Sequence, residues 1–98
     1  MEFKSQLFDK INSMPNDLTV EAKFVDEEMK IFVVKLLGNL DTYNSDSFAK
    51  AVNAEVEKME NLKFVVFDME NVNYMSSTGI GSVVDVDTRA KKRNIELY

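Results

Sequence analysis

The order of apolar stretches along the chain is the feature that most constrains its fold. Two stretches, 31–37 and 63–69, have the near-continuous hydrophobicity of buried strands. Each is followed by apolar residues at helical spacing, over 44–60 and 76–93. Strands that alternate with helices are joined by right-handed crossovers and pair in parallel. The sequence therefore predicts an α/β fold with a mostly parallel sheet.

A β-hairpin is expected before this alternation begins. Apolar and polar residues alternate over 18–24, as in a strand with one face in water. The polar turn 26–28 then leads into the strand 31–37. A further strand is expected over 95–98. The predicted sheet is thus mixed, opened by an antiparallel hairpin, with helices packed on it.

The composition excludes several classes of function. The chain of 98 residues predicts one domain, and it contains no Cys and no His. This removes disulfides, thiol nucleophiles, Ser-His-Asp triads and the usual zinc sites. Little then remains for acid–base chemistry near neutral pH, so we expect neither an enzyme nor a cofactor.

The net charge of −5 argues against direct binding of nucleic acid, which requires clustered Lys and Arg. The one basic cluster, 89–93, lies at the end of a predicted helix and there complements the helix dipole. The first residues lack the apolar core of a signal peptide, and the longest apolar run is too short to span a bilayer. We therefore expect a cytoplasmic protein without membrane contact.

Three consecutive hydroxyl residues, Ser76, Ser77 and Thr78, begin the second predicted helix. The first backbone N–H groups of a helix have no partner within the helix. Capping of those groups explains one hydroxyl, but not three. Gly79 and Gly81 then leave the first turn without side-chain bulk, so another molecule could approach the backbone closely. This junction is the candidate functional site.

Two motifs resemble those of a known family. Gly38-Asn39-Leu40-Asp41 precedes a helix, and Phe64-Val65-Val66-Phe67-Asp68 precedes Tyr74-Met75-Ser76-Ser77-Thr78-Gly79-Ile80-Gly81. In this order and at this separation, they resemble the STAS domain of bacterial anti-sigma factor antagonists, over about residues 18 to 98. The resemblance implies a STAS domain over 16–98, truncated at its C-terminus, after an extra N-terminal helix within 1–15.

The resemblance also implies a phosphorylation switch. In that family, an anti-sigma factor that is an ATP-dependent serine kinase phosphorylates a serine after the third core strand. The unphosphorylated protein binds this kinase and frees the sigma factor, and a metal-dependent serine phosphatase resets the switch. The phosphorylated serine falls on Ser77, with Ser76 and Thr78 as alternative acceptors, and Asp41 matches a family Asp beside the site. The partner surface would comprise the following residues: Asp41, Ser76, Thr78, Gly79 and Gly81.

Other interpretations remain beside this one. A small-molecule binding module is the alternative function, because nucleotides or lipids can also bind at the strand ends of α/β sheets. Asp68 and Glu70 either bind a divalent cation or belong to a polar loop after a strand; spacing supplies no further ligand, so we expect no metal.

The first residues predict an amphipathic helix over 2–14, with apolar residues on one face: Phe3, Leu7, Ile11 and Met14. This helix either packs on the surface left open by the short C-terminus, within its own chain or across a homodimer, or is a loose appendage of a chain fragment.

Overall fold

The computed structural model describes residues 2–98 and confirms the predicted α/β fold. In chain order its elements are β1 Glu2–Phe3, α1 Gln6–Ser13, β2 Leu18–Phe24, β3 Ile31–Leu40, α2 Ser45–Glu57, β4 Phe64–Met75, α3 Ser77–Lys92 and β5 Glu96–Leu97. Within the described residues the strands form one sheet in the order β1-β2-β3-β4-β5. The β1–β2 and β2–β3 pairs are antiparallel, and the β3–β4 and β4–β5 pairs are parallel.

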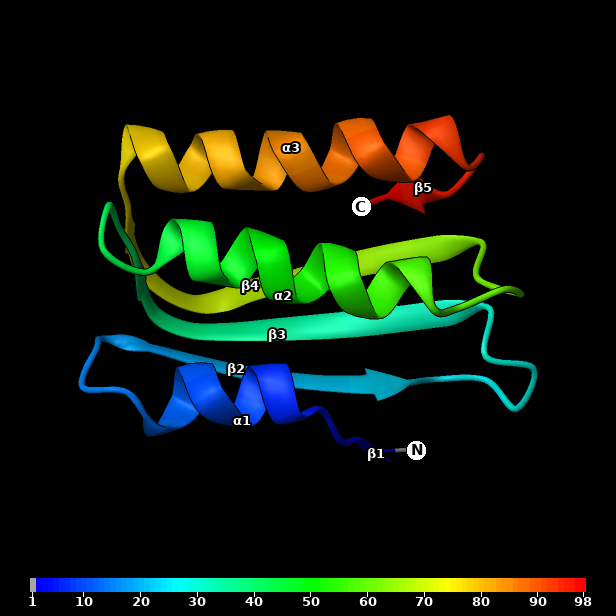
Figure 1. Cartoon of the computed structure of the whole chain (residues 1–98), viewed down its shortest axis with the longest axis horizontal. Helices are drawn as coiled ribbons and strands as arrows, with labels where there is room; N and C mark the ends of the chain where they lie inside the picture. The colour runs from blue at the N-terminus through cyan, green and yellow to red at the C-terminus, as the bar shows by residue number, and fades with distance from the viewer. Residues whose placement is uncertain (1) are drawn as a thin grey trace.

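The structure has two layers. The helices of the described chain all lie on one face of the sheet, with α1 over β2 and α2 over β3 and β4 (Figure 1). The core lies between the layers and is formed by alternate strand residues and by the inner faces of the helices. Its fully buried members include Phe32, Val34, Leu36, Leu40, Phe48, Val52 and Val65. Within residues 2–98 no helix is long and apolar enough to cross a bilayer.

The N-terminal helix is shorter than predicted. It begins at Gln6 because the Ser5 side chain caps it, accepting a hydrogen bond from the backbone N–H of Phe8 at 3.2 Å. Residues 2–3 instead pair with β2 as a short strand. The buried face of α1 consists of Phe8 and Ile11, whereas Leu7 is 38% exposed. The helix packs within its own chain, against β2 and α2.

The strand β4 is longer than predicted and runs to Met75 rather than residue 69. Its second half continues to pair with β3, from Leu37 opposite Asn71 to Leu40 opposite Met75, with two irregularities in register. Gly38, which adopts a φ of 102° and lies against the Asp17 carbonyl, allows one of them. Asp68 and Glu70 therefore lie within a strand, and the expected strand-end loop around them is wrong.

Candidate functional site

Ser76 joins the end of β4 to the start of α3, and its polar groups are engaged in the junction. Its backbone N–H donates to the Leu40 carbonyl at 2.9 Å, which extends the pairing of the two parallel strands by one bond. Its side-chain Oγ accepts a hydrogen bond from the Gly79 N–H at 3.0 Å, as in an N-cap. Ser76 thus fixes how the chain enters the helix.

The two glycines of this turn have different surroundings. Gly79 is buried, and a Cβ atom there would lie 2.5 Å from the Leu40 carbonyl oxygen. The missing side chain therefore lets α3 approach the chain's own strand β3. Gly81 is exposed, and a Cβ atom there would meet nothing within 4 Å. Its surroundings leave room for an approaching molecule.

Ser77 and Thr78 are the first residues of α3, and both are exposed. Within residues 2–98, the Ser77 hydroxyl makes no hydrogen bond to another group. It lies at the N-terminus of the helix, where the helix dipole and the first backbone N–H groups favour negative charge. The N-terminus of α3 would therefore favour a phosphate on this oxygen.

Asp41 lies beside this junction. Leu40 is paired with Met75, so the residues that follow, Asp41 and Ser76, leave the sheet next to one another. The Asp41 Oδ1 accepts hydrogen bonds from the N–H groups of Tyr43 at 2.9 Å and Asn44 at 3.2 Å. The side chain therefore shapes the turn before α2, which is the common role of Asp at such a position.

An apolar surface near the site was missed by the sequence reasoning. Ile80 and Val84 are 54% and 55% exposed, and they follow Ser77 by three and seven residues. Side chains at these spacings share one face of a helix, so Ser77 lies at the end of an exposed apolar stripe on α3. Tyr43 and Tyr74 are also exposed, and they lie near the same end of the sheet. The sequence signal would have been two apolar residues, Ile80 and Val84, on the same helix face as Ser77 and opposite the buried Val86 and Ala90.

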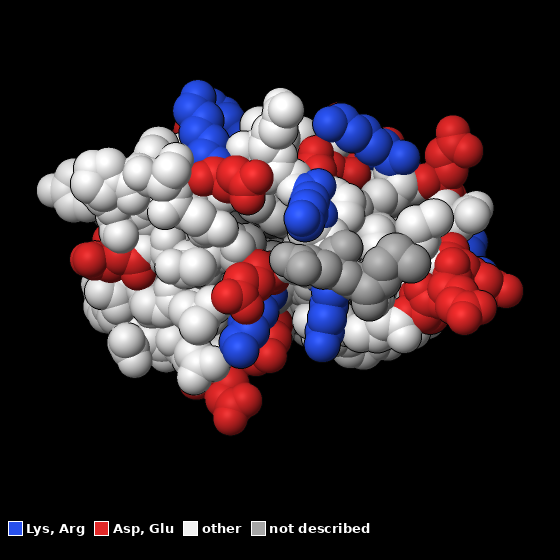
Figure 2. All heavy atoms as spheres, turned by 90° about the horizontal axis from the view of Figure 1, so that it is seen from below, with Lys and Arg blue, Asp and Glu red and all other residues white. Residues whose placement is uncertain are grey.

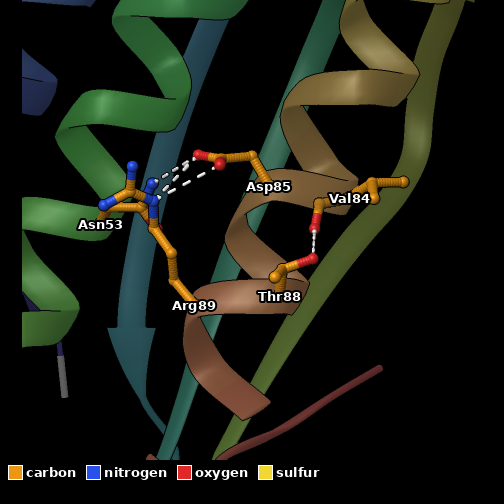
Figure 3. A network of polar contacts seen from close by, with 5 residues as sticks. All are labelled: Asn53, Val84, Asp85, Thr88 and Arg89. Atoms are coloured by element: carbon orange, nitrogen blue, oxygen red, sulfur yellow. Dashed lines mark hydrogen bonds and ion pairs between the residues drawn. The ribbon is translucent and has the colours of Figure 1, made fainter. Parts of the chain in front are cut away.

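Asp85, about two turns after Ser77 in α3, forms a hydrogen bond to α2. Figure 3 shows that Asn53 of α2 and Arg89 of α3 both reach its carboxylate. The Asn53 Nδ2 donates to the carboxylate at 3.0 Å, and the Arg89 Nε lies 3.3 Å from the same oxygen. Asp85 thus has a structural role, because it supplies one exposed hydrogen bond between α2 and α3.

Charged side chains of both signs lie on the face of the molecule drawn in Figure 2. Acidic and basic side chains are interspersed there, and the basic ones do not gather into one patch. Among residues 2–98, no group of three or more His, Cys, Asp and Glu is placed to hold a metal ion.

Comparison with known proteins places this geometry in a family. The STAS domain model matches residues 22–98. Among solved structures, the anti-sigma factor antagonist SpoIIAA in its unphosphorylated form is 15% identical, with a TM-score of 0.66 over 81% of this chain and 69% of that chain. Bacillus SpoIIAA in its phosphorylated form is also similar, at 15% identity and a TM-score of 0.65 over 81% of this chain and 68% of that chain.

Two further structures share the fold. An anti-sigma factor antagonist from Mycobacterium paratuberculosis is 20% identical, with a TM-score of 0.66 over 87% of this chain and 68% of that chain. The murine anion transporter Slc26a9 is 15% identical, with a TM-score of 0.66 over 94% of this chain but 17% of that chain. The fold therefore occurs in regulators and within a transporter. The match over residues 22–98 shows that this chain belongs to the STAS domain family.

Proposed function

We propose that the chain is an anti-sigma factor antagonist whose partner binding is controlled by phosphorylation of Ser77. The unphosphorylated chain binds an anti-sigma factor serine kinase and thereby frees a sigma factor for transcription. Phosphorylation releases the chain from the kinase, and a metal-dependent serine phosphatase restores the binding form. The chain itself acts as a regulator in the cytoplasm and catalyses no reaction.

One observation favours Ser77 over Ser76 as the acceptor, while the choice of Ser77 over Thr78 comes from the family motif. The Ser77 hydroxyl is exposed and without a hydrogen bond among residues 2–98, whereas the Ser76 hydroxyl accepts a bond from Gly79. A hydroxyl that caps a helix must give up that bond to enter another active site, at a cost of about 1 kcal/mol. Ser77 has no such cost. The family resemblance of the surrounding motif supports the same assignment.

The charge of a phosphate explains the direction of the switch. Phosphorylation adds about −1.5 to −2 charge to a neutral hydroxyl. Within the chain, this charge is accommodated at the N-terminus of α3. At a partner interface that covers Ile80 and Val84, the same charge would have to lose its water beside apolar groups, which is costly. The partner then dissociates without any large change in the fold.

Phosphate mapping tests the proposal. We expect incubation with the partner kinase and ATP to add one phosphate, located on Ser77 by fragmentation mass spectrometry. The Ser77→Ala variant should gain none, and the matched variants Ser76→Ala and Thr78→Val should still be modified at Ser77. Phosphate found only on Ser76 or Thr78 would overturn the assignment. A chain that is neither bound nor modified by such a kinase would instead favour a small-molecule binding module.

A further inference from the structure

The sheet has a second face that the described helices do not cover. Successive side chains of a strand point to opposite faces, so the residues of β3 and β4 that alternate with the core point away from α1, α2 and α3. Five of these residues are apolar and half-buried, and none packs against the core: Ile31, Val33, Leu37, Phe64 and Val66. The same face carries Lys35 and Asp68. We call this surface of β3 and β4 the open face.

The register of the two strands orders the open face into matched rows. Ile31 is paired with Phe64, and Val33 with Val66, so these two apolar residues of β3 each have an apolar neighbour on β4, whereas Leu37 lies beyond a register shift and is paired with Asn71. In the row that follows Val33, Lys35 is paired with Asp68, so a positive residue has a negative neighbour. The first three rows therefore join residues that would also attract one another across an interface.

We propose that the open face binds a second copy of this chain through a two-fold axis parallel to the strands, between β3 and β4. This axis brings β3 of one copy over β4 of the other. Each β3 residue then lies over the β4 residue with which it is paired within its own sheet, but in the second copy. Val33 then lies over Val66 of the second copy, and Lys35 over Asp68 of the second copy, each twice. Two sheets stacked this way are aligned, and the twist of each sheet gives them an angle of about −30°.

The charges favour a second copy over another partner. The apolar rows require an apolar counterpart, while Lys35 and Asp68 require an acidic and a basic group at a fixed separation. The chain's own open face supplies all of these in the correct positions. An interface that uses the same patch on both copies is the usual form of a two-fold dimer.

The dimer is independent of the switch proposed above. Ser77 lies on the outer face of α3, in the helical layer, and the open face lies on the other side of the sheet. Both Ser77 hydroxyls therefore stay accessible in the dimer, and phosphorylation should leave the dimer dissociation constant unchanged.

A charge exchange between chains tests the arrangement. We expect sedimentation equilibrium of the full chain to give the mass of a dimer at high concentration. Lys35→Glu and Asp68→Lys should each weaken the dimer by about tenfold or more, since each places like charges opposite one another. An equimolar mixture of the two variants should form a heterodimer, because the new carboxylate of one chain lies over the new ammonium of the other. The control Lys10→Glu makes the same charge change on exposed α1 and should dimerise normally.

The mixture separates this proposal from effects within one chain. Each variant keeps two like charges on its own neighbouring strands, so mixing cannot relieve strain inside a chain. Circular dichroism checks that each variant is folded, and Val66→Thr, which keeps the β-branched shape, provides a milder disruption that should also weaken the dimer. A monomeric wild-type chain at every concentration would overturn the proposal. So would single variants that dimerise normally, or a mixture that forms no heterodimer.

Discussion

A Cβ atom on Gly79 would lie 2.5 Å from the carbonyl oxygen of Leu40, so α3 rests on the end of β3 at a point where no side chain fits. The same carbonyl accepts the hydrogen bond from the Ser76 N–H. One buried residue of β3 thus fixes both the cap and the first turn of α3. The exposed position of Ser77 follows from that contact.

Gly79→Ala should lower the free energy of unfolding by about 1–3 kcal/mol, the usual cost of forcing an added methyl into a filled space. Gly81→Ala is the matched control. It adds the same atom in open space and should be neutral or stabilising by up to about 1 kcal/mol, because Ala favours a helix over Gly. Urea unfolding measures both values. Equal effects of the two substitutions would contradict the packing role of Gly79.

Substitutions at Ser77 should change partner binding without changing the fold. Ser77→Ala should bind the kinase constitutively, because the methyl group leaves the contact uncharged. Ser77→Asp should bind poorly, since its carboxylate brings charge to the apolar stripe of Ile80 and Val84. Calorimetric titration with the kinase measures both affinities. Equal affinities would mean that charge at this position does not control the complex.

The apolar stripe makes its own contribution to partner binding under this proposal. Val84→Ser should weaken the kinase complex by about 1–3 kcal/mol if Val84 is buried by the partner. Val84 is 55% exposed in the free chain, so the stability of that chain should change by less than about 0.5 kcal/mol. Lys50→Ala, an exposed change on α2, is the control and should leave binding unaltered. Unchanged affinity of the Val84 variant would place the partner elsewhere.

Local patterns predicted the parts of the fold that local forces decide. The alternation over Leu18–Phe24 matches the buried and exposed sides of β2, because the helices cover only one face of the sheet and the other face of β2 meets water. The alternation of strands and helices likewise gave the parallel pairs β3–β4 and β4–β5. The errors came from contacts between distant residues. The extension of β4 to Met75 depends on pairing with β3. The two strands are separated by α2 in the chain, so no short segment of sequence carries information on this pairing.

The candidate site shows the same limit. The position of Ser77 at the start of a helix was predictable from the hydroxyl residues and the helical spacing that follows. The role of Gly79 was not, because a glycine that admits the chain's own backbone and one that admits a partner look alike in sequence. At the N-terminus, the helical spacing placed Ile11 correctly on the buried face but Leu7 wrongly, since Phe8 packs inward in its place once Ser5 starts the helix.

Asp41 has a structural role that can be separated from its charge. Asp41→Ala removes the oxygen that accepts the N–H groups of Tyr43 and Asn44 and should cost about 1 kcal/mol of stability. Asp41→Asn retains an oxygen acceptor but removes the charge, so its stability should stay close to that of the wild type. If the charge contributes to the kinase contact, the Asn variant should still bind more weakly. Wild-type affinity of the Asn variant would limit Asp41 to the turn.

Arg93 joins the end of α3 to the end of α2, and its loss should loosen the helical layer. Its Nη1 donates to the Val56 carbonyl at 2.7 Å and its Nη2 to the Met59 carbonyl at 3.0 Å, so the guanidinium caps the C-terminus of α2. Arg93→Ala should therefore cost about 1–2 kcal/mol of unfolding free energy, as for hydrogen bonds from a charged donor that is partly in water.

Two further variants are controls for the Arg93 prediction. Arg93→Lys keeps the positive charge and should recover only part of this loss, because an ammonium lacks the planar fork that reaches both carbonyls. Lys92→Ala changes the same charge at an exposed neighbour and should alter stability by less than about 0.5 kcal/mol. Equal losses for Arg93→Ala and Lys92→Ala would show that this cluster acts only through the dipole of its own helix.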